Sequence, residues 1–246
     1  MKYKIEICAD TVESAMIAQN AGADRVELCA GLPEGGTTPS HGCIASARAN
    51  LKIALHVMIR PRGGDFLYSD LEVDVMRRDI DACRQCGADG IVLGLLTADG
   101  SVDVGRAAAL IEHARPMAAT FHRAFDLCRD PMQGLEDVIA AGASRLLTSG
   151  HKASADEGAA LIKRLVDAAT ERIIIMAGAG VNESNVMRIA SATGAREFHL
   201  TAAGTVESEM TFKRTGIALG GSLADDEYSR RAADGGKIER ILRALT

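Results

Sequence analysis

The sequence predicts an α/β fold, a (β/α)8 barrel of the TIM type built as a single domain, and three observations support it. Short apolar runs alternate with longer helix-like stretches along the chain, which is typical of parallel β-α-β units. Several helical stretches are followed by a glycine (Gly22, Gly87 and Gly142), the residue favoured where a helix ends in the left-handed conformation. The length of 246 residues also suits one barrel domain.

Eight runs rich in Ile, Val and Leu predict the strands of the barrel. They cover residues 5–9, 25–29, 53–60, 90–95, 117–122, 145–148, 172–177 and 196–201. Seven stretches with helical periodicity predict the helices, at residues 12–21, 40–50, 71–86, 104–114, 131–141, 154–169 and 184–193. An open, doubly wound sheet is the competing architecture, but the strand count and the chain length favour a closed barrel.

The C-terminal region departs from the repeating pattern. Residues 1–201 contain the eight strand-and-helix units, and residues 202–246 form a C-terminal extension. The extension begins with a glycine-rich stretch at residues 202–222, and the charged helical tail after it is interrupted at Gly235 and Gly236. We therefore expect an irregular region that replaces or displaces the last helix of the barrel.

Composition and charge argue against several functions. The net charge is −5 and no cluster of Lys or Arg follows a helix or strand, whereas binding to nucleic acid needs concentrated positive charge. Aromatic residues make up only 3% of the chain, which disfavours base stacking. No apolar run is long enough to cross a bilayer, and the charged first residues lack the apolar core of a signal peptide. We expect a cytoplasmic protein, with no nucleic-acid or membrane partner, whose six cysteines are free thiols.

The strand pattern predicts an unusually polar barrel interior. Because side chains alternate along a strand, the aliphatic residues face the helices and the other set faces inward. Barrel interiors are normally filled by branched aliphatic side chains, and a buried charge costs free energy unless it is paired. The predicted inward set comprises Glu6, Cys8, Glu27, Cys29, His56, Met58, Arg60, Thr120 and His122.

The polar members of this set permit two interpretations. Glu6 and Glu27 are expected to pair with Arg60, with His56 and His122 bridging them, and such a network could simply hold the barrel together. Active sites of this fold, however, lie at the carboxyl ends of the strands. The same five residues are therefore candidate catalytic residues, with Glu6 or Glu27 as general base and a histidine as acid or electrophile.

Two glycine-rich loops suggest anion binding. Arg60 and Arg62 precede a Gly-Gly pair, an arrangement suited to gripping a carboxylate or phosphate. Taken by itself, this loop is better explained as a structural loop held by an Arg–Asp65 pair. A Gly-x-Gly turn after the seventh strand precedes a helix, where backbone N–H groups and the helix dipole favour an anion. The candidate anion-binding residues are Arg60, Arg62, Thr148, Gly178 and Gly180.

The cysteines offer a second kind of site. Cys8 and Cys29 lie at equivalent ends of adjacent strands on the inward face, and with the thioether of Met58 they would suit a soft ion such as Cu(I). Chemistry alone favours two small buried apolar side chains, since free cysteine is among the most buried residues. Cys83 and Cys86 have no second pair and so lack the four ligands of a zinc site.

Several segments resemble the CutC copper homeostasis family. They are IEIC at residues 5–8, GADRVELC at 22–29, EGGTTPS at 34–40, VMIRPRGGDF at 57–66, TFHRAFD at 120–126, LTSG at 147–150 and FH at 198–199. The resemblance implies a cytoplasmic TIM barrel that forms homo-oligomers, is linked to copper tolerance or trafficking, and binds Cu(I) through cysteines. Cys8 and Cys29 match the family's cysteine positions. The chain departs from the family at His199-Leu200-Thr201-Ala202, where members often place Ser or Cys, so a further soft ligand is missing there.

Three functions follow from these observations. The first is a copper homeostasis protein that binds Cu(I), with a dimer as the favoured homo-oligomer. The second is a TIM-barrel enzyme, a lyase, isomerase or hydrolase, acting on a small anionic or phosphorylated metabolite, which would explain a polar barrel mouth that copper storage does not require. The third is a structural or partner-binding barrel that binds neither.

Overall fold

Eight parallel strands close into a barrel, so the predicted fold is confirmed and an open sheet is excluded. The computed structural model describes residues 3–214, 216–217 and 227–245. Each strand pairs with the next, and the last pairs back with the first, where Ile5 lies beside Phe198. The barrel strands are β1 (Lys4–Ala9), β2 (Arg25–Leu28), β3 (Ala54–Met58), β4 (Gly90–Leu93), β5 (Ala118–Phe121), β6 (Arg145–Thr148), β7 (Ile174–Gly178) and β8 (Glu197–Leu200).

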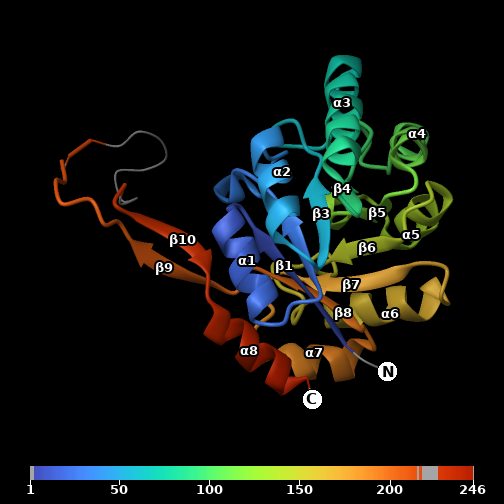
Figure 1. Cartoon of the computed structure of the whole chain (residues 1–246). Helices are drawn as coiled ribbons and strands as arrows, with labels where there is room; N and C mark the ends of the chain where they lie inside the picture. The colour runs from blue at the N-terminus through green and yellow to red at the C-terminus, as the bar shows by residue number, and fades with distance from the viewer. Residues whose placement is uncertain (1–2, 215, 218–226, 246) are drawn as a thin grey trace.

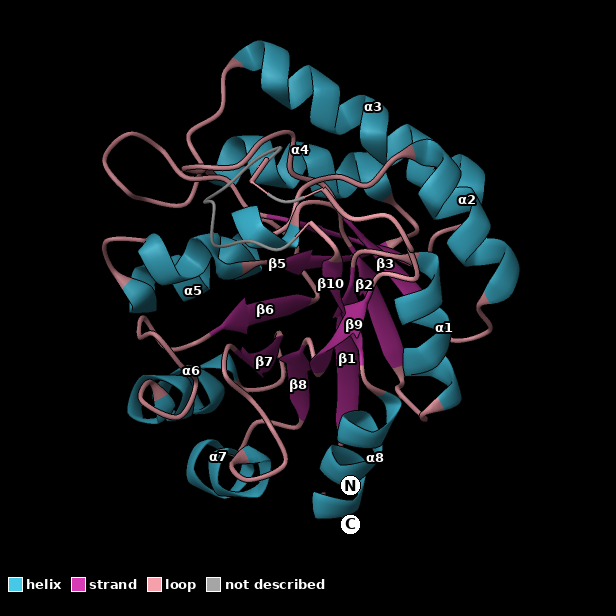
Figure 2. Cartoon of the chain, turned by 90° about the vertical axis from the view of Figure 1, so that its left-hand side faces the viewer, coloured by secondary structure: helices cyan, strands magenta, loops and turns pink. Residues whose placement is uncertain are grey.

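The helices form a ring around these strands (Figure 2). Two short 3-10 helices, η1 (Leu32–Glu34) and η2 (Arg123–Leu127), lie in the loops after β2 and β5. The helix predicted at residues 154–169 is shorter than expected, because residues 154–158 form turns and the helix begins at Ala159. The helices are α1 (Val12–Asn20), α2 (His41–Asn50), α3 (Asp70–Cys86), α4 (Val104–Ala114), α5 (Pro131–Ala140), α6 (Ala159–Ala169), α7 (Val186–Thr193) and α8 (Gly235–Ala244).

The main apolar core lies between the strands and the helix ring, as strand alternation predicts. Side chains such as Ile5, Val26 and Phe121 are fully buried there together with apolar residues of the helices. A separate, smaller apolar cluster of Cys8, Cys29, Met58 and Val92 belongs to the inward side of the strands. The barrel interior therefore carries sulfur and polar groups where such barrels usually carry aliphatic ones.

Glycines on the fourth strand and just after it make room for two inward histidines. A Cβ atom at Gly90 would lie 2.5 Å from Nε2 of His56, and one at Gly94 would lie 2.4 Å from Nδ1 of His122. Atoms cannot approach so closely, so these imidazoles occupy space that any other residue at these positions would need.

The end of the chain contains an eighth helix, and the predicted interruption at Gly235 and Gly236 is wrong. These glycines are the first residues of α8, which begins after Asp234, whose side chain accepts a hydrogen bond of 3.1 Å from the backbone N–H of Lys237. The helix contacts α7 on one side and α1 on the other, and so completes the ring (Figure 1). The last helix is thus displaced along the sequence, as one of the two expectations had it.

A β-hairpin causes this displacement. Strands β9 (Ala203–Glu207) and β10 (Ser229–Ala233) pair antiparallel between β8 and α8 and project from the barrel (Figure 1). Residues 203–207 of the stretch predicted to be irregular are therefore a strand, whereas residues 218–222 of that stretch lie outside the described residues. The hairpin is anchored to the barrel where the backbone N–H of Ala233 donates to Ser14 Oγ at 3.1 Å. Within the described ranges, no helix is long and apolar enough to span a membrane.

Candidate functional site

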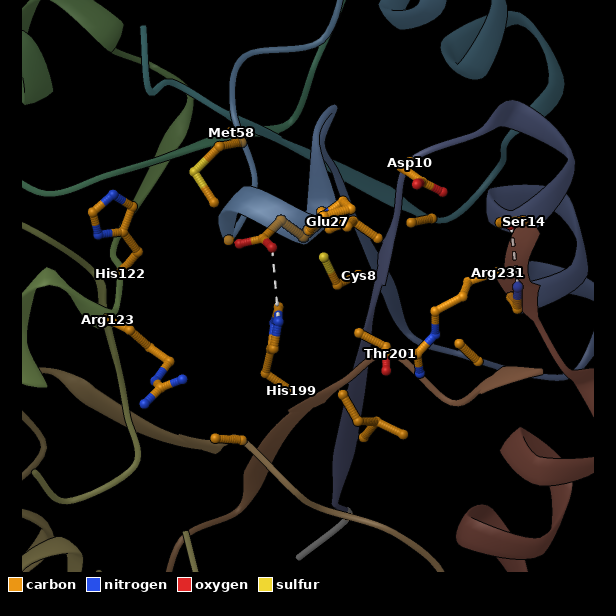
Figure 3. A pocket seen from close by; sticks show the side chains of 18 of the residues that line it. Cys8, Asp10, Ser14, Glu27, Met58, His122, Arg123, His199, Thr201 and Arg231 are labelled. Atoms are coloured by element: carbon orange, nitrogen blue, oxygen red, sulfur yellow. Dashed lines mark hydrogen bonds and ion pairs between the residues drawn. The ribbon is translucent and has the colours of Figure 1, made fainter. Parts of the chain in front are cut away.

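A cavity of about 1030 Å³ lies at the carboxyl ends of the strands, where active sites of this fold are found. Its walls come from the barrel strands and their loops on one side and from the β9–β10 hairpin on the other. Figure 3 shows Cys8, Glu27 and His199 in the middle of this cavity, His122 and Arg123 on one side, and Ser14 and Arg231 on the other. The cavity thus joins the predicted barrel-mouth residues to a C-terminal arm that sequence patterns did not reveal.

The two predicted sulfur ligands lie side by side. Sγ of Cys8 is 3.7 Å from Sγ of Cys29, and both side chains are buried beside Met58. Parallel pairing of β1 and β2 produces this proximity, because the backbone N–H of Cys29 donates to the carbonyl of Ala9 at 2.8 Å. Hydrogen bonding from Cys29, partly offset by burial, lowers the pKa of Cys8 to about 5, and His199 contributes in the same direction. Cys8, which lines the cavity, is therefore the thiolate of the pair, and burial and Cys8 keep Cys29 a thiol.

His199 connects the sulfur pair to the barrel carboxylates. Its Nδ1 lies 2.7 Å from Oε1 of Glu6, and its Nε2 lies 3.7 Å from Oε2 of Glu27. Burial opposes a charged imidazole, but Glu27, Cys8 and Glu6 together hold the pKa of His199 well above its ordinary value. One ligand atom each from Cys8, Glu27 and His199 lies within 4.8 Å of the others. Sequence reasoning placed His199 on the last strand but not among the site residues, although its position opposite Glu6 in the β1–β8 register provides the signal.

Glu6 and Glu27 do not pair with Arg60, so that prediction is wrong. The cation that pairs with Glu6, and also with Glu197, is Arg25. Nε of Arg25 forms an ion pair with Glu6, and its Nη2 lies 2.8 Å from Glu197. Arg145 also pairs with Glu197 at 2.8 Å, which extends the network across the interior. Arg25 lies within the strand predicted at residues 25–29 and has the same parity as Glu27, so alternation places it on the inward face, but it was left out of the predicted inward set.

Arg60 instead holds loops together. Its guanidinium donates hydrogen bonds of 2.8 Å to the backbone carbonyls of Glu34, Gly36 and Gly64, and it stacks over Phe66 at 4.9 Å from the ring centre. The carbonyls belong to the two loops that follow β2 and β3. Arg60 therefore fixes the shape of one cavity wall, and the guanidinium remains buried at 4% exposure.

The two remaining candidate catalytic residues do not bridge the carboxylates as expected. His56 Nδ1 is 4.0 Å from Glu6, too far for a hydrogen bond, and burial lowers the pKa of His56 to about 4. His122 lines the cavity, and burial and then the charge of Arg60 lower its pKa to about 3. Both imidazoles are therefore neutral at pH 7.

Of the five candidate anion-binding residues, only Arg60 and Gly180 line the cavity. Arg62 turns away from it and pairs with Glu72 at 2.6 Å and with Asp65 at 3.1 Å, so the structural interpretation of its loop is the correct one. The hydroxyl of Thr148 is buried against the carboxylate of Asp126. Gly178 is buried within β7, under the side chain of Leu147.

The buried carboxylate of Glu6 should be important for stability. Replacing Glu6 by Gln removes one of the two negative charges that compensate Arg25 inside the barrel, and breaking a buried pair in this way costs about 3–5 kcal/mol. Asp74→Asn is the matched control, because Asp74 pairs with Arg77 and Arg78 on the solvent-exposed side of α3, where such pairs contribute little. Urea unfolding should show a large loss of stability for the first variant and almost none for the second; equal losses would contradict this assignment.

His122 should make the fold less stable in acid. The unfolded chain takes up a proton on this imidazole near pH 6.5, whereas the folded protein resists protonation down to about pH 3. Stability should therefore fall as the pH drops through this window, by about 1.4 kcal/mol per pH unit from this residue. The variant His122→Asn lacks the His122 contribution to this loss of stability. Its Oδ1 can replace Nδ1 as acceptor for the N–H of Ala124. Unfolding free energies of the two proteins between pH 7 and pH 4 test this, and a constant difference would refute it.

Comparison with known proteins places the chain among relatives of nearly the same length. The CutC family model matches residues 3–204. A CutC family protein of Chromobacterium violaceum is 56% identical over 241 residues, covering 98% of this chain and 97% of the relative. The human copper homeostasis protein cutC homolog is 48% identical over 243 residues, covering 99% of this chain and 89% of the relative.

Solved structures also resemble this chain. The structure of CutC from Streptococcus agalactiae superposes with a TM-score of 0.78 and 36% identity, covering 81% of this chain and 98% of that one. Thiamine phosphate pyrophosphorylase from Pyrococcus furiosus matches with a TM-score of 0.58 and 15% identity over 99% of this chain and 95% of that one, a likeness of fold alone. With a family model that spans most of the barrel and relatives about half identical over almost the whole chain, this protein belongs to the CutC family.

Proposed function

We propose that this CutC family member is a copper homeostasis protein that binds Cu(I) through Cys8 and Cys29. The observation that carries the proposal is the 3.7 Å separation of the two sulfur atoms. Thiolates bind a soft metal ion at about 2.3 Å, so two sulfurs up to roughly 4.6 Å apart can share one ion. The human relative is named a copper homeostasis protein, which points to the same cargo.

The side chains around the sulfur pair suit a monovalent soft ion. Met58 adds a polarizable thioether, and soft thiolate and thioether ligands select Cu(I). Met58 and His199 both line the cavity with Cys8, so either can complete the ligand set. The chain has Thr201 before Ala202, where family members often have Ser or Cys, so a further soft ligand is missing there. On the preceding strand, His199 offers a ring nitrogen within 4.8 Å of Cys8 Sγ.

Binding through both sulfurs requires the Cys29 proton to leave. Oε2 of Glu27 lies 3.4 Å from Sγ of Cys29 and is the nearest carboxylate to it. Burial raises the pKa of Glu27 well above its ordinary value. In its ionised form Glu27 would accept the thiol proton on copper binding and return it on release. Cys8 lines the cavity and provides the side from which the ion enters.

The cytoplasm is the compartment that suits this chemistry. Cys8 and Cys29 are free thiols, as are the other four cysteines, and sulfur ligands must stay reduced to bind Cu(I).

Copper stoichiometry tests the site. Under anaerobic conditions the wild-type protein should retain about one Cu(I) per chain against a chromophoric chelator, and Cys8→Ser/Cys29→Ser should retain almost none. Cys43→Ser/Cys86→Ser is the matched control, since it removes two half-buried thiols away from the cavity. Unchanged tight binding by the Cys8/Cys29 double variant would reject these ligands.

The hairpin arm supports assembly into a homo-oligomer, with a dimer favoured. Val206, Met210 and Phe212 expose 41%, 59% and 65% of their surface on this arm. Clustered apolar side chains on a projecting element are typical of an interface between copies.

Sedimentation equilibrium provides the test of assembly. The wild-type protein should be a dimer, and Phe212→Asp should weaken dimerisation at least about tenfold. Leu71→Asp, at an apolar position on α3 that is 75% exposed, should leave dimerisation unchanged. A wild-type monomer at micromolar concentration would overturn the proposal.

A further inference from the structure

We infer that the side of the cavity formed by Arg60 and His122 is a second binding site, for the carboxylate or phosphate group of a small organic anion. Figure 3 shows His122 and Arg123 on one side of the cavity, Cys8 in the middle and Arg231 on the other side. The site does not depend on copper binding, and its chemistry is different, because it offers hydrogen-bond donors where the other end offers soft ligands.

Unpartnered buried donors are the observation that carries this inference. Among the described residues, six buried side-chain atoms lack a hydrogen-bond partner, and three of their residues line the cavity: Glu27, Arg60 and His122. The atoms on the last two are Nε of Arg60 and Nε2 of His122, and each side chain is only 4% exposed. A buried polar atom normally has a partner, and one without a partner costs free energy. The Tyr68 hydroxyl interacts with the Arg60 side chain, so Nε2 of His122 is the donor beside the cavity that most clearly calls for an acceptor from a ligand.

The hydrogen bonding of His122 determines which ring nitrogen carries the proton. Its Nδ1 accepts a hydrogen bond of 3.1 Å from the backbone N–H of Ala124, so Nδ1 carries a lone pair and the proton of the neutral ring is on Nε2. Nε2 is therefore a donor and has no lone pair for a metal ion. This end of the cavity consequently selects an oxygen acceptor and does not extend the copper site.

Arg60 determines the charge of the ligand. Its two terminal nitrogens are occupied by three backbone carbonyls, which neutralise no charge, and no carboxylate of the described residues pairs with it. A buried cation without a counter-charge is unfavourable. Phe66 contacts both side chains, with its ring centre 4.9 Å from the Arg60 guanidinium and 5.0 Å from the centre of the His122 ring. An anionic group at this end of the cavity would compensate the charge of Arg60 and accept a hydrogen bond from Nε2 of His122.

The rest of the cavity determines the size of the ligand. A volume of about 1030 Å³ is far larger than one phosphate or carboxylate group and matches sites for whole metabolites. Leu32 and Leu147 give the walls apolar surface, and Arg231 and Arg123 also line them, Arg123 being paired with Asp126 at 2.7 Å. The expected ligand is therefore an organic molecule with its anionic group at Arg60 and His122 and its body extending toward the hairpin.

Thermal denaturation of the copper-free full-length protein tests this site. The probes are inorganic phosphate, glycerol 3-phosphate and succinate, with glycerol and chloride at matched ionic strength as controls. At least one organic anion should raise the Tm in a concentration-dependent way, and the comparison of glycerol 3-phosphate with succinate separates a phosphate site from a carboxylate site.

Two substitutions at one position separate binding from folding. His122→Asn keeps an acceptor for the N–H of Ala124 and removes the Nε2 donor, so it should weaken anion binding at least about tenfold. His122→Gln places an amide N–H near the position of Nε2 and should bind more tightly than His122→Asn. Cys8→Ser/Cys29→Ser should bind the anion as the wild-type protein does, so failure of the copper proposal leaves this one intact. The inference is overturned if no probe at about 10 mM stabilises the wild-type protein, or if His122→Asn binds as tightly as wild type.

Discussion

The ion pairs of Arg25 with Glu6 and Glu197 are the interaction on which the rest of the barrel interior depends. Inward-facing charges are costly in this fold, and Arg25 on β2 compensates two carboxylates, Glu6 on the neighbouring β1 and Glu197 on β8. With Glu6 held as a carboxylate, its second oxygen is available to His199 at 2.7 Å. His199 in turn stabilises the thiolate form of Cys8. The reactivity of the sulfur pair thus follows from a charge network one layer deeper in the barrel.

Strand alternation was sufficient to predict which residues face inward but not which of them pair. Strand alternation places Glu6 and Glu27 in the barrel interior, where they need a cation; Arg60 was the cation predicted, whereas Glu6 pairs with Arg25. The choice depends on the register between strands, which sets Glu6 beside Arg25 and is fixed by backbone pairing that no local pattern encodes. His199 was missed for the same reason, since its partner is on the first strand, at the other end of the chain. Arg60 lies at the end of a strand, which led to the prediction that it pairs with the inward carboxylates. Its hydrogen-bond partners are three backbone carbonyls in loops, and a strand pattern gives no information about such partners.

The C-terminal region shows a second limit of local patterns. Gly235 and Gly236 are poor helix formers, but tertiary packing of α8 against α1 and α7 overrides this preference and the helix begins there. The hairpin was hidden because its partners, residues 203–207 and 229–233, are separated by a long glycine-containing segment, and antiparallel pairing over such a distance leaves no turn signature. The hairpin contributes one wall of the cavity, so this missed element is also the part of the site that the sequence did not predict.

The cavity joins two sets of groups that favour different ligands, and this arrangement explains why so polar a mouth accompanies a sulfur pair. Cys8, Cys29 and Met58 offer soft electron pairs, whereas Arg60 and His122 offer only N–H donors. A metal ion gains nothing from the donors, and an anion is repelled by thiolate sulfur. Neither set can therefore replace the other, and a protein that only stored copper would have no use for a buried cation without a counter-charge. Cys8, Met58, Arg60 and His122 line one cavity together with the hairpin, so a molecule bound to the donors would share that cavity with an ion bound to the sulfurs.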